Sequence, residues 1–198
     1  MDERREEFLA LLKAWGEAND VAAPDRAHKM LNITGDTGLF LWMVLRAWRP
    51  ARLLEVGTSN GYSTIWWADS LAAGASLVTL ERDPRKIEAA RKNFREAGVE
   101  DRISAVEGDA DAYLRQAPAA SFDWIFLDSD RDAYVGWWPE VLRLLRPDGL
   151  VVVDNAVDKA AEVVAFREVV DRTAGVRQVL VPIGNGELFI ARFGDAGA

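Results

Sequence analysis

The stretch LLEVGTSNGYS, from Leu53 to Ser63, decides how this chain folds. Its apolar start is typical of a buried strand, and Gly57 and Gly61 indicate a tight turn that leads into a helix. A carboxylate, Glu55, stands two residues before the turn. The stretch therefore predicts a strand, a turn and a helix with a negative charge near a place where ligands bind.

The same alternation continues along the chain. Strand-like apolar runs at 52–56, 76–81, 103–107, 122–127 and 149–153 alternate with helical patterns at 62–72, 84–97, 110–116, 134–145 and 159–173. Runs such as WIFL and LVVV are apolar on both faces, as buried parallel strands require. VRQVLVP and ELFIARF flank a Gly-Asn-Gly turn, which predicts a final antiparallel hairpin. We expect an α/β fold with a mostly parallel, seven-stranded sheet.

We expect one domain over residues 1–198, in which residues 1–50 form an N-terminal helical extension. Apolar side chains recur at helical spacing within 2–18, and a second helix is expected over 37–48. The first helix has no place in the minimal sheet. We therefore expect it to form a homodimer contact or to cover a substrate site.

Composition excludes several classes of function. The chain has no cysteine, which rules out thiolate zinc sites and cysteine nucleophiles, and its single histidine is His28. The formal net charge of -8 argues against binding along a nucleic-acid backbone. The charged start MDERREEFLALLKAW lacks the apolar core of a signal peptide, and no run is long enough to span a membrane. We expect a cytoplasmic protein.

Acidic residues stand at every expected strand end: Glu55, Glu81, Asp109, Asp128 and Asp154. Any one of them could simply cap the following helix. Together they would face one crevice and repel one another unless cations lie among them, so the ligand should be positive. Glu55 would oppose a dinucleotide pyrophosphate, whereas S-adenosylmethionine carries a sulfonium and an ammonium group. Glu55 could meet that ammonium directly or through water, Gly57 and Gly61 would let the backbone come close, and Glu81 could accept both ribose hydroxyls.

A second group of polar residues consists of Asp128, Asp154 and Asn155. Two carboxylates and an amide carbonyl are hard oxygen ligands, suited to Mg²⁺ or a similar ion. The alternative is that these residues cap helices and form an Asx turn. The sequence favours the metal site.

Several motifs together resemble a known family. The segments LNITGDTG, LEVGTSNGYST, VTLERDP, GDADAYL, FDWIFLDSDRDAY and LVVVDNA resemble the cation-dependent O-methyltransferases, which include the catechol and caffeoyl-CoA O-methyltransferases. The resemblance implies a Rossmann-like class I methyltransferase fold, S-adenosylmethionine as cofactor and a small phenolic acceptor.

The resemblance also implies roles for individual residues. Cofactor contacts would come from Asn32 and Ile33 in the pocket, Glu55 and Ser63 at the methionine end, Glu81 at the ribose, Asp109 and Ala110 at the adenine, and Asp130. A divalent ion held by Asp128, Asp154 and Asn155 would chelate a vicinal diol. Asp128 and Arg131 would be the catalytic residues.

Two features depart from the family. Arg131 stands where a lysine is usual, and because arginine keeps its charge it can orient or stabilise an oxyanion but not take a proton. The proton would then pass to Asp130 or solvent, unless the metal alone supplies an ionised acceptor or the substrate is not a catechol. The segment after Asn155 is also short, which predicts an open acceptor pocket. Of the tryptophan pairs, core packing is favoured for most, and Trp137 or Trp138 is the expected acceptor contact.

Two other functions stay open. An NAD-dependent oxidoreductase shares such a sheet, but Glu55 and the incomplete glycine pattern of GTSNGY disfavour it. A protein that binds S-adenosylmethionine without turnover is the other alternative, in which Arg131 marks a lost activity.

Overall fold

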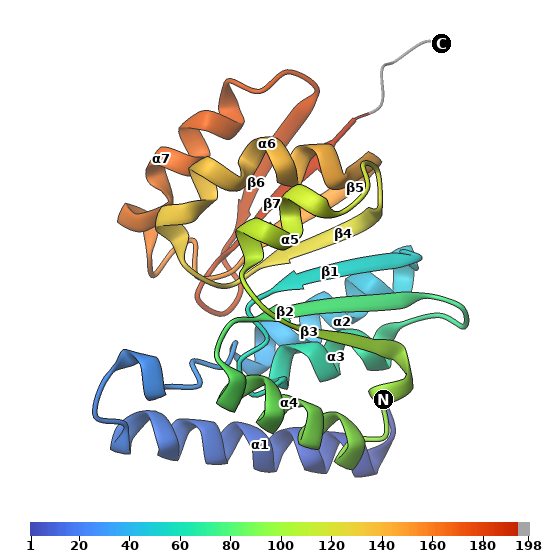
Figure 1. Cartoon of the computed structure of the whole chain (residues 1–198), viewed down its shortest axis with the longest axis vertical. Helices are drawn as coiled ribbons and strands as arrows, with labels where there is room; N and C mark the ends of the chain where they lie inside the picture. Colours follow the sequence, from blue (N-terminus) through green and yellow to red (C-terminus); the bar gives the residue numbers. More distant parts are fainter. Residues whose placement is uncertain (194–198) are drawn as a thin grey trace.

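The computed structural model describes residues 1–193 and has the predicted mixed sheet (Figure 1). Its seven strands lie in the order β3-β2-β1-β4-β5-β7-β6. Their bounds are β1 Arg52–Val56, β2 Ser76–Glu81, β3 Ile103–Glu107, β4 Phe122–Leu127, β5 Leu145–Val153, β6 Val176–Val181 and β7 Glu187–Arg192. The first five strands pair in parallel, and β7 runs antiparallel between β5 and β6. This confirms the predicted α/β architecture with a terminal hairpin.

Helices cover both faces of the sheet (Figure 1). They are α1 Glu3–Ala22, α2 Gly35–Trp48, α3 Tyr62–Ser70, α4 Pro84–Glu96, α5 Ala110–Gln116, α6 Tyr134–Leu144 and α7 Ala160–Asp171, with short 3₁₀ turns η1 Arg26–His28, η2 Glu100–Arg102 and η3 Arg131–Ala133. One core cluster takes its side chains from α5, α6 and α7, and the other from α1 to α4. The central strands β1, β4 and β5 are therefore buried on both faces, which explains why their sequences are mostly apolar.

Polar residues at the start of several helices explain where those helices begin. Thr34 accepts a hydrogen bond from the Thr37 backbone N–H at the start of α2, and Asp83 accepts one from Arg85 at the start of α4, where Pro84 is the first helical residue. Such caps satisfy backbone donors that have no partner inside the helix. They also fix the segments that lead from the strand ends into the helices.

The strand register brings the carboxyl ends of the central strands level with one another. Val56 at the end of β1 lies opposite Leu80 of β2 and Leu127 of β4, and Leu127 lies opposite Val153 of β5. The chain winds from β1 outward to β3, and β4 returns to the other side of β1. This reversal is the place where open α/β sheets bind ligands.

The structure extends some predicted elements. α1 continues to Ala22, and β5 begins at Leu145 because that residue already pairs with Phe122 before the register shifts at Phe122/Trp124. Pro147, Asp148 and Gly149 lie in this extension, and they hid its start in the sequence. The site at the other end of β5 is unaffected.

Two of the four tryptophans in the pairs Trp66-Trp67 and Trp137-Trp138 can be assigned to core packing. Trp67 and Trp138 are buried in the two core clusters, and Trp138 donates its indole N–H to Thr173 Oγ1. Trp137 is partly buried against the core and lies 5.9 Å from the Tyr134 ring, centroid to centroid. Core packing is confirmed for Trp67 and Trp138, which leaves Trp137 as the better candidate for an acceptor contact.

Candidate active site

The polar residues that follow β1, β2, β4 and β5 form one continuous edge. Because these four strands are neighbours in the order β2-β1-β4-β5, the structure places Glu81, Gly57, Asp128 and Asp154 next to one another along it. This is the juxtaposition that the sequence predicted for cofactor and metal residues.

The turn after β1 is held against both neighbouring strands. The backbone N–H groups of Gly57 and Thr58 donate to the Leu80 carbonyl. Gly57 has φ +110°, and a Cβ there would lie 1.9 Å from the Asp128 carbonyl oxygen; at Gly61 (φ +86°) it would lie 2.4 Å from the Phe94 ring. Both glycines thus allow close packing of the protein with itself, a different reason from the ligand approach that we predicted.

Glu55 lies inside the protein beneath this turn. Its Oε1 accepts hydrogen bonds from Ser63 Oγ (2.6 Å) and Trp67 Nε1 (2.9 Å), and its Oε2 accepts from Thr64 Oγ1 (2.5 Å) and Thr79 Oγ1 (2.6 Å). The side chain is fully buried. Burial raises the pKa of Glu55, and the four donors oppose that shift.

This arrangement argues against the contact, direct or through water, that we predicted between Glu55 and a ligand ammonium group. All the lone pairs of the carboxylate are already used by donors of the protein. Ser63, the other residue expected at the methionine end, gives its hydroxyl hydrogen to Glu55 and keeps lone pairs for a ligand. Glu55 therefore holds α3 and β2 against β1, and the sequence could not show this because the donors come from distant segments.

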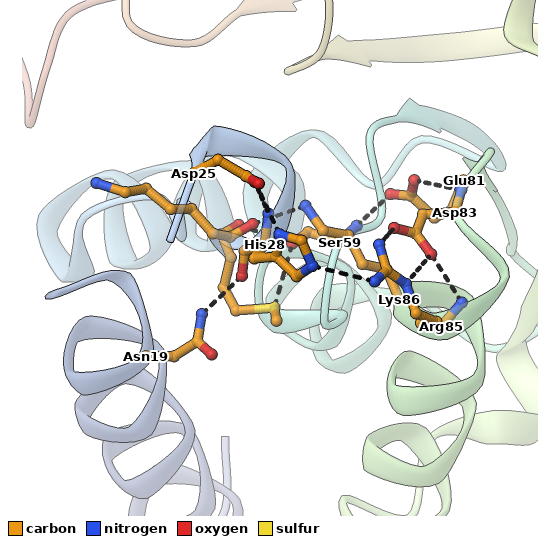
Figure 2. A network of polar contacts seen from close by, with 10 residues as sticks. Asn19, Asp25, His28, Ser59, Glu81, Asp83, Arg85 and Lys86 are labelled. Atoms are coloured by element: carbon orange, nitrogen blue, oxygen red, sulfur yellow. Dashed lines mark hydrogen bonds and ion pairs between the residues drawn. The ribbon is translucent and has the colours of Figure 1, made fainter. Parts of the chain in front are cut away.

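Glu81 is fixed at the end of β2 in a way that suits a diol (Figure 2). Its Oε2 accepts the backbone N–H of Ser59 (2.8 Å), and its Oε1 accepts that of Asp83 (2.9 Å). Each oxygen keeps a lone pair, and the side chain is partly exposed. The orientation fits the predicted acceptance of two ribose hydroxyls.

Ser59 connects Glu81 to the segment between α1 and α2. Its hydroxyl donates to the Met30 carbonyl (2.7 Å), so the same residue that orients Glu81 also holds that segment (Figure 2). Asp20 accepts the backbone N–H groups of Met30 (2.6 Å) and Leu31 (2.9 Å), and Lys86 donates to the Lys29 carbonyl (2.6 Å). Sequence analysis missed Ser59, although its place inside the glycine turn was a signal.

Asn32 and Ile33 follow this segment directly. Ile33 belongs to the core cluster formed with α1 to α4 and is 3% exposed. Both polar atoms of the Asn32 side chain are buried, and neither has a hydrogen-bond partner among residues 1–193. Buried amides without partners are rare, so Asn32 has the properties expected of a ligand contact.

A cavity of about 310 Å³ lies beside this region. It is lined by residues of the end of α1, the η1 segment and the start of α4, among them Ala23, His28, Met30 and Arg85. His28 Nδ1 lies 2.7 Å from Asp25 Oδ1, and its Nε2 lies 3.3 Å from Arg85 Nη1 (Figure 2). The predicted cofactor residues do not line this cavity.

The residues predicted near the adenine lie further out. Asp109 is exposed and caps α5 by accepting the Ala112 backbone N–H (3.2 Å), and Ala110 is the first residue of that helix. Asp130, which was predicted to contact the cofactor but not at the adenine, is exposed and precedes η3. For Asp109 the structure shows the helix cap, which was the alternative to a ligand contact. A capping side chain still leaves the backbone of Asp109 free to contact a ligand.

Three carboxyl groups cluster at the ends of β4 and β5. Asp154 is 1% exposed and the neighbouring Glu187, at the start of β7, is fully buried. Glu187 accepts the Thr37 hydroxyl (3.1 Å), but no hydrogen-bond partner in the described chain reaches Asp154 Oδ1 or Glu187 Oε2. Burial raises the pKa of Asp154, and it raises the pKa of Glu187 to about 7. The pKa of Asp128 is also raised, mainly by burial and secondly by the nearby charge of Asp154. The cluster therefore favours a proton or a cation.

Glu187 was not predicted as a site residue. In the sequence it stands at the start of a hairpin strand, where a glutamate is unremarkable. Since β7 inserts between β5 and β6, the strand is central and its glutamate is buried. A charged residue in an otherwise apolar central strand was the signal that could have found it.

The amide of Asn155 lies against the acids. Its Nδ2 donates to Asp154 Oδ2, and its Oδ1 accepts from Asn185 Nδ2 (3.1 Å). Asn155 has a left-handed backbone (φ +62°), which an asparagine tolerates. The hairpin turn closes over this segment, because the backbone N–H groups of Val157 and Asp158 both donate to the Asn185 carbonyl.

Arg131 completes the cluster as its nearest cation. Its Nη2 lies 3.6 Å from Asp128 Oδ1 and its Nη1 lies 3.6 Å from Glu162 Oε2. The residue is only 6% exposed, and its Nε is buried with no hydrogen-bond partner in residues 1–193. Beside it, burial raises the pKa of Tyr134, whose hydroxyl oxygen accepts the Ser129 backbone N–H (2.8 Å). Neither Arg131 nor Tyr134 suits a role as a proton acceptor at neutral pH.

The chemistry of the predicted metal ligands can be compared with what a divalent cation requires. No group of three or more His, Cys, Asp or Glu side chains within residues 1–193 is arranged as a metal site, so a site here needs the Asn155 amide. Asp154 Oδ1 is buried without a donor, and Asp128 and Asp154 both interact with the Arg131 guanidinium. The Asn155 amide presents its N–H to Asp154, and it would have to turn over, together with that of Asn185, to present its oxygen instead. The donor set fits a hard divalent cation.

Comparisons with known proteins agree with this geometry. Residues 17–192 match the family model described as O-methyltransferase. The catechol O-methyltransferase of Mycobacterium tuberculosis is 37% identical over 141 residues, 69% of this chain and 63% of the relative, and that of Niastella koreensis is 34% identical over 151 residues, 75% and 66%. The chain thus spans just under two thirds of the length of these curated relatives.

A solved structure agrees over nearly the whole chain. The O-methyltransferase TomG of Streptomyces achromogenes, involved in tomaymycin synthesis and solved in complex with S-adenosylmethionine, is 26% identical, with a TM-score of 0.77 over 98% of this chain and 91% of that one. The fold and the family match lead to the same conclusion. The chain belongs to the O-methyltransferase family.

Proposed function

We propose that this protein transfers a methyl group from S-adenosylmethionine to a hydroxyl of a small, catechol-like phenolic acceptor, assisted by a divalent cation such as Mg²⁺. The observation that carries the proposal is the pair Asp128 and Asp154, with an unpartnered buried oxygen on Asp154, on the same sheet edge as Glu81. The relatives named catechol O-methyltransferase and the solved relative with bound S-adenosylmethionine support it.

The cofactor contacts of this proposal follow the edge of the sheet. Glu81 accepts the ribose hydroxyls, and the unpartnered amide of Asn32 contacts the methionine end together with Ser63. Asp109 and Ala110 border the adenine, and Asp130 lies against another part of the cofactor. Glu55 acts from inside, because its hydrogen bonds fix the α3 residues Ser63 and Thr64 beneath the turn.

The metal part rests on Asp128, Asp154 and Asn155. A divalent cation bound there supplies a Lewis acid that lowers the pKa of an acceptor hydroxyl and orients it. The chain's own part is to hold that oxygen in line with the methyl group and to keep the acids in place. In the transfer the oxygen–carbon bond forms as the carbon–sulfur bond breaks, so the sulfonium loses its charge and the hydroxyl proton leaves to solvent or Asp130.

Arg131 has an electrostatic role in this scheme. Its guanidinium stays charged at every relevant pH, so it neutralises Asp128 and stabilises negative charge on the acceptor oxygen. The rival proposal, a protein that binds S-adenosylmethionine without turnover, would treat the same arginine as the mark of a lost activity.

The proposed assembly is a homodimer without nucleic-acid or membrane partners. Leu11 and Trp15 on α1 and Leu39 and Met43 on α2 are large, exposed apolar residues, which supports an association through these helices. Within residues 1–193, no helix has both the length and the apolarity needed to cross a membrane.

Transfer of labelled methyl to a panel of acceptors tests the proposed function. Catechols, monophenols and hydroxamates are each incubated with labelled S-adenosylmethionine, with Mg²⁺ and with excess chelator. We expect label on catechols only when Mg²⁺ is present. Cofactor binding without transfer to any acceptor would favour the rival proposal.

A further inference from the structure

Arg131 lies between two acids that come from different parts of the chain. Asp128 follows β4, and Glu162 lies in the first turn of α7. The guanidinium is 3.6 Å from each of them, through Nη2 to Asp128 Oδ1 and through Nη1 to Glu162 Oε2. The Arg131 side chain is 5% exposed whereas that of Glu162 is 44% exposed, so the guanidinium is buried between an inner and an outer acid.

Asp128, the inner acid, can interact with either of two positive charges. Asp128 pairs with Arg131 and is also one of the carboxylates that suit a divalent cation. A cation between Asp128 and Asp154 would bring a second positive charge next to the guanidinium, and both charges would lie in a largely buried region where water screens them weakly. A bound cation therefore weakens the pairing of Arg131 with Asp128.

The outer acid offers the guanidinium another partner. The turn after Asn155 is short, so α7 begins at Ala160 and brings Glu162 within reach of Arg131. Glu162 Oε1 also lies 3.7 Å from Lys159 Nζ, which leaves Oε2 for Arg131. The short segment that departs from the family pattern thus supplies an acid for the arginine that also departs from it.

We propose that Glu162 is a positioning residue that holds the Arg131 guanidinium when a divalent cation occupies Asp128 and Asp154. This inference rests on the proposed metal site. Glu162 does not touch the cation; it acts by keeping a positive charge at a distance from it. Without Glu162, the carboxylate that pairs with Arg131 among residues 1–193 is Asp128, and Arg131 competes with the cation for it.

Titration of Mn²⁺ into the full-length protein, followed by the electron paramagnetic resonance of free Mn²⁺, tests this without an activity assay. Glu162→Gln keeps the shape of the side chain and removes its charge. We expect it to raise the Kd for Mn²⁺ about tenfold, because the released guanidinium returns to Asp128. Glu168→Gln is the matched control, since Glu168 lies on the same helix and pairs with the exposed Arg172 (3.6 Å); its Kd should stay within about twofold of wild type.

A double-mutant cycle separates positioning from simple loss of negative charge. In an Arg131→Met background, Glu162→Gln should change the Kd for Mn²⁺ by less than about twofold, because the residue through which it acts is gone. An equal loss of affinity in both backgrounds would show that Glu162 acts on the cation by charge alone and would overturn the inference.

Two further outcomes distinguish this inference from the proposed function. If wild type binds Mn²⁺ and Glu162→Gln binds it equally well, the positioning role is wrong while the metal site stands. If wild type binds no Mn²⁺, the metal site and the positioning role fall together.

Discussion

Gly57 and Asp128 meet so closely that a Cβ on the glycine would lie 1.9 Å from the aspartate's carbonyl oxygen. The contact joins the end of β1 to the end of β4, and the Asp128 backbone N–H donates to the Val56 carbonyl beside it (3.0 Å). The turn beside the proposed cofactor residues and the strand that leads to the proposed metal ligands are therefore fixed to each other. Neither can shift without moving the other.

This contact predicts that Gly57→Ala destabilises the protein more than an ordinary glycine replacement. The new methyl group would clash with the Asp128 backbone and would also sit on a residue with φ +110°. Gly98→Ala is the control, because Gly98 has φ +66° and a methyl group added there would point into open space, with no packing neighbour within 4 Å. We expect a loss of about 1 kcal/mol for Gly98→Ala and about 3 kcal/mol or more for Gly57→Ala in urea unfolding. Equal losses would show that the contact with Asp128 has no energetic role.

Glu55→Gln separates a structural acid from a cofactor ligand. The glutamine amide cannot accept hydrogen bonds from all four donors, because one of its two polar atoms is itself a donor. The indole N–H of Trp67 can only donate, so it cannot adapt to that change. We expect the free energy of unfolding to fall by about 2–4 kcal/mol, while the folded variant binds S-adenosylmethionine within about threefold of wild type. Calorimetry of unfolding and of cofactor binding measures both. A variant that is as stable as wild type but has lost affinity for S-adenosylmethionine would instead show that Glu55 contacts the cofactor.

Glu81→Ala should act in the opposite way. If its carboxylate accepts the ribose hydroxyls as proposed, its loss should weaken cofactor binding about 10- to 100-fold, measured by calorimetry. Glu107→Ala is the matched control, because Glu107 pairs with Glu81 across the β2–β3 register and is exposed. Unchanged affinity in the Glu81 variant would refute the ribose assignment.

Glu187 gives the metal-free protein a pH dependence of stability. Burial raises the pKa of Glu187 to about 7, above its ordinary value of 4.5, so the folded state keeps a proton that the unfolded state loses as the pH rises. The free energy of unfolding should therefore fall as the pH rises from about 5 to about 7, by about 1–3 kcal/mol more than in Glu187→Gln. The glutamine side chain is neutral at every pH and serves as the reference. Denaturant unfolding in chelator across this range measures it. If the free energy of unfolding depends on pH in the same way in wild type and in Glu187→Gln, the raised pKa of Glu187 is wrong.

The sequence predicted the fold well because its evidence is local. Strand-like runs such as 52–56 and 122–127 and the Gly-Asn-Gly turn depend on neighbouring residues alone, and the structure has them within the same bounds. Strand ends that face the same way must meet at one edge, so the meeting of Asp128 with Asp154 also followed from the pattern.

The roles that depend on partners distant in sequence could not be predicted in the same way. Glu55 looked available to a ligand, because its donors come from α3 and β2 and no spacing rule connects them. Glu187 and Glu162 were missed since the first depends on where β7 inserts and the second on the length of one turn. In each case, the charge was visible in the sequence but its partner was not.

The most direct test of the central claim is methyl transfer from labelled S-adenosylmethionine to a catechol by wild type and by Asp154→Ala, at saturating cofactor and with Mg²⁺. The account predicts transfer by wild type, and at least about 100-fold less by Asp154→Ala, which should still bind the cofactor within about threefold of wild type. Transfer at the wild-type rate by Asp154→Ala would contradict it.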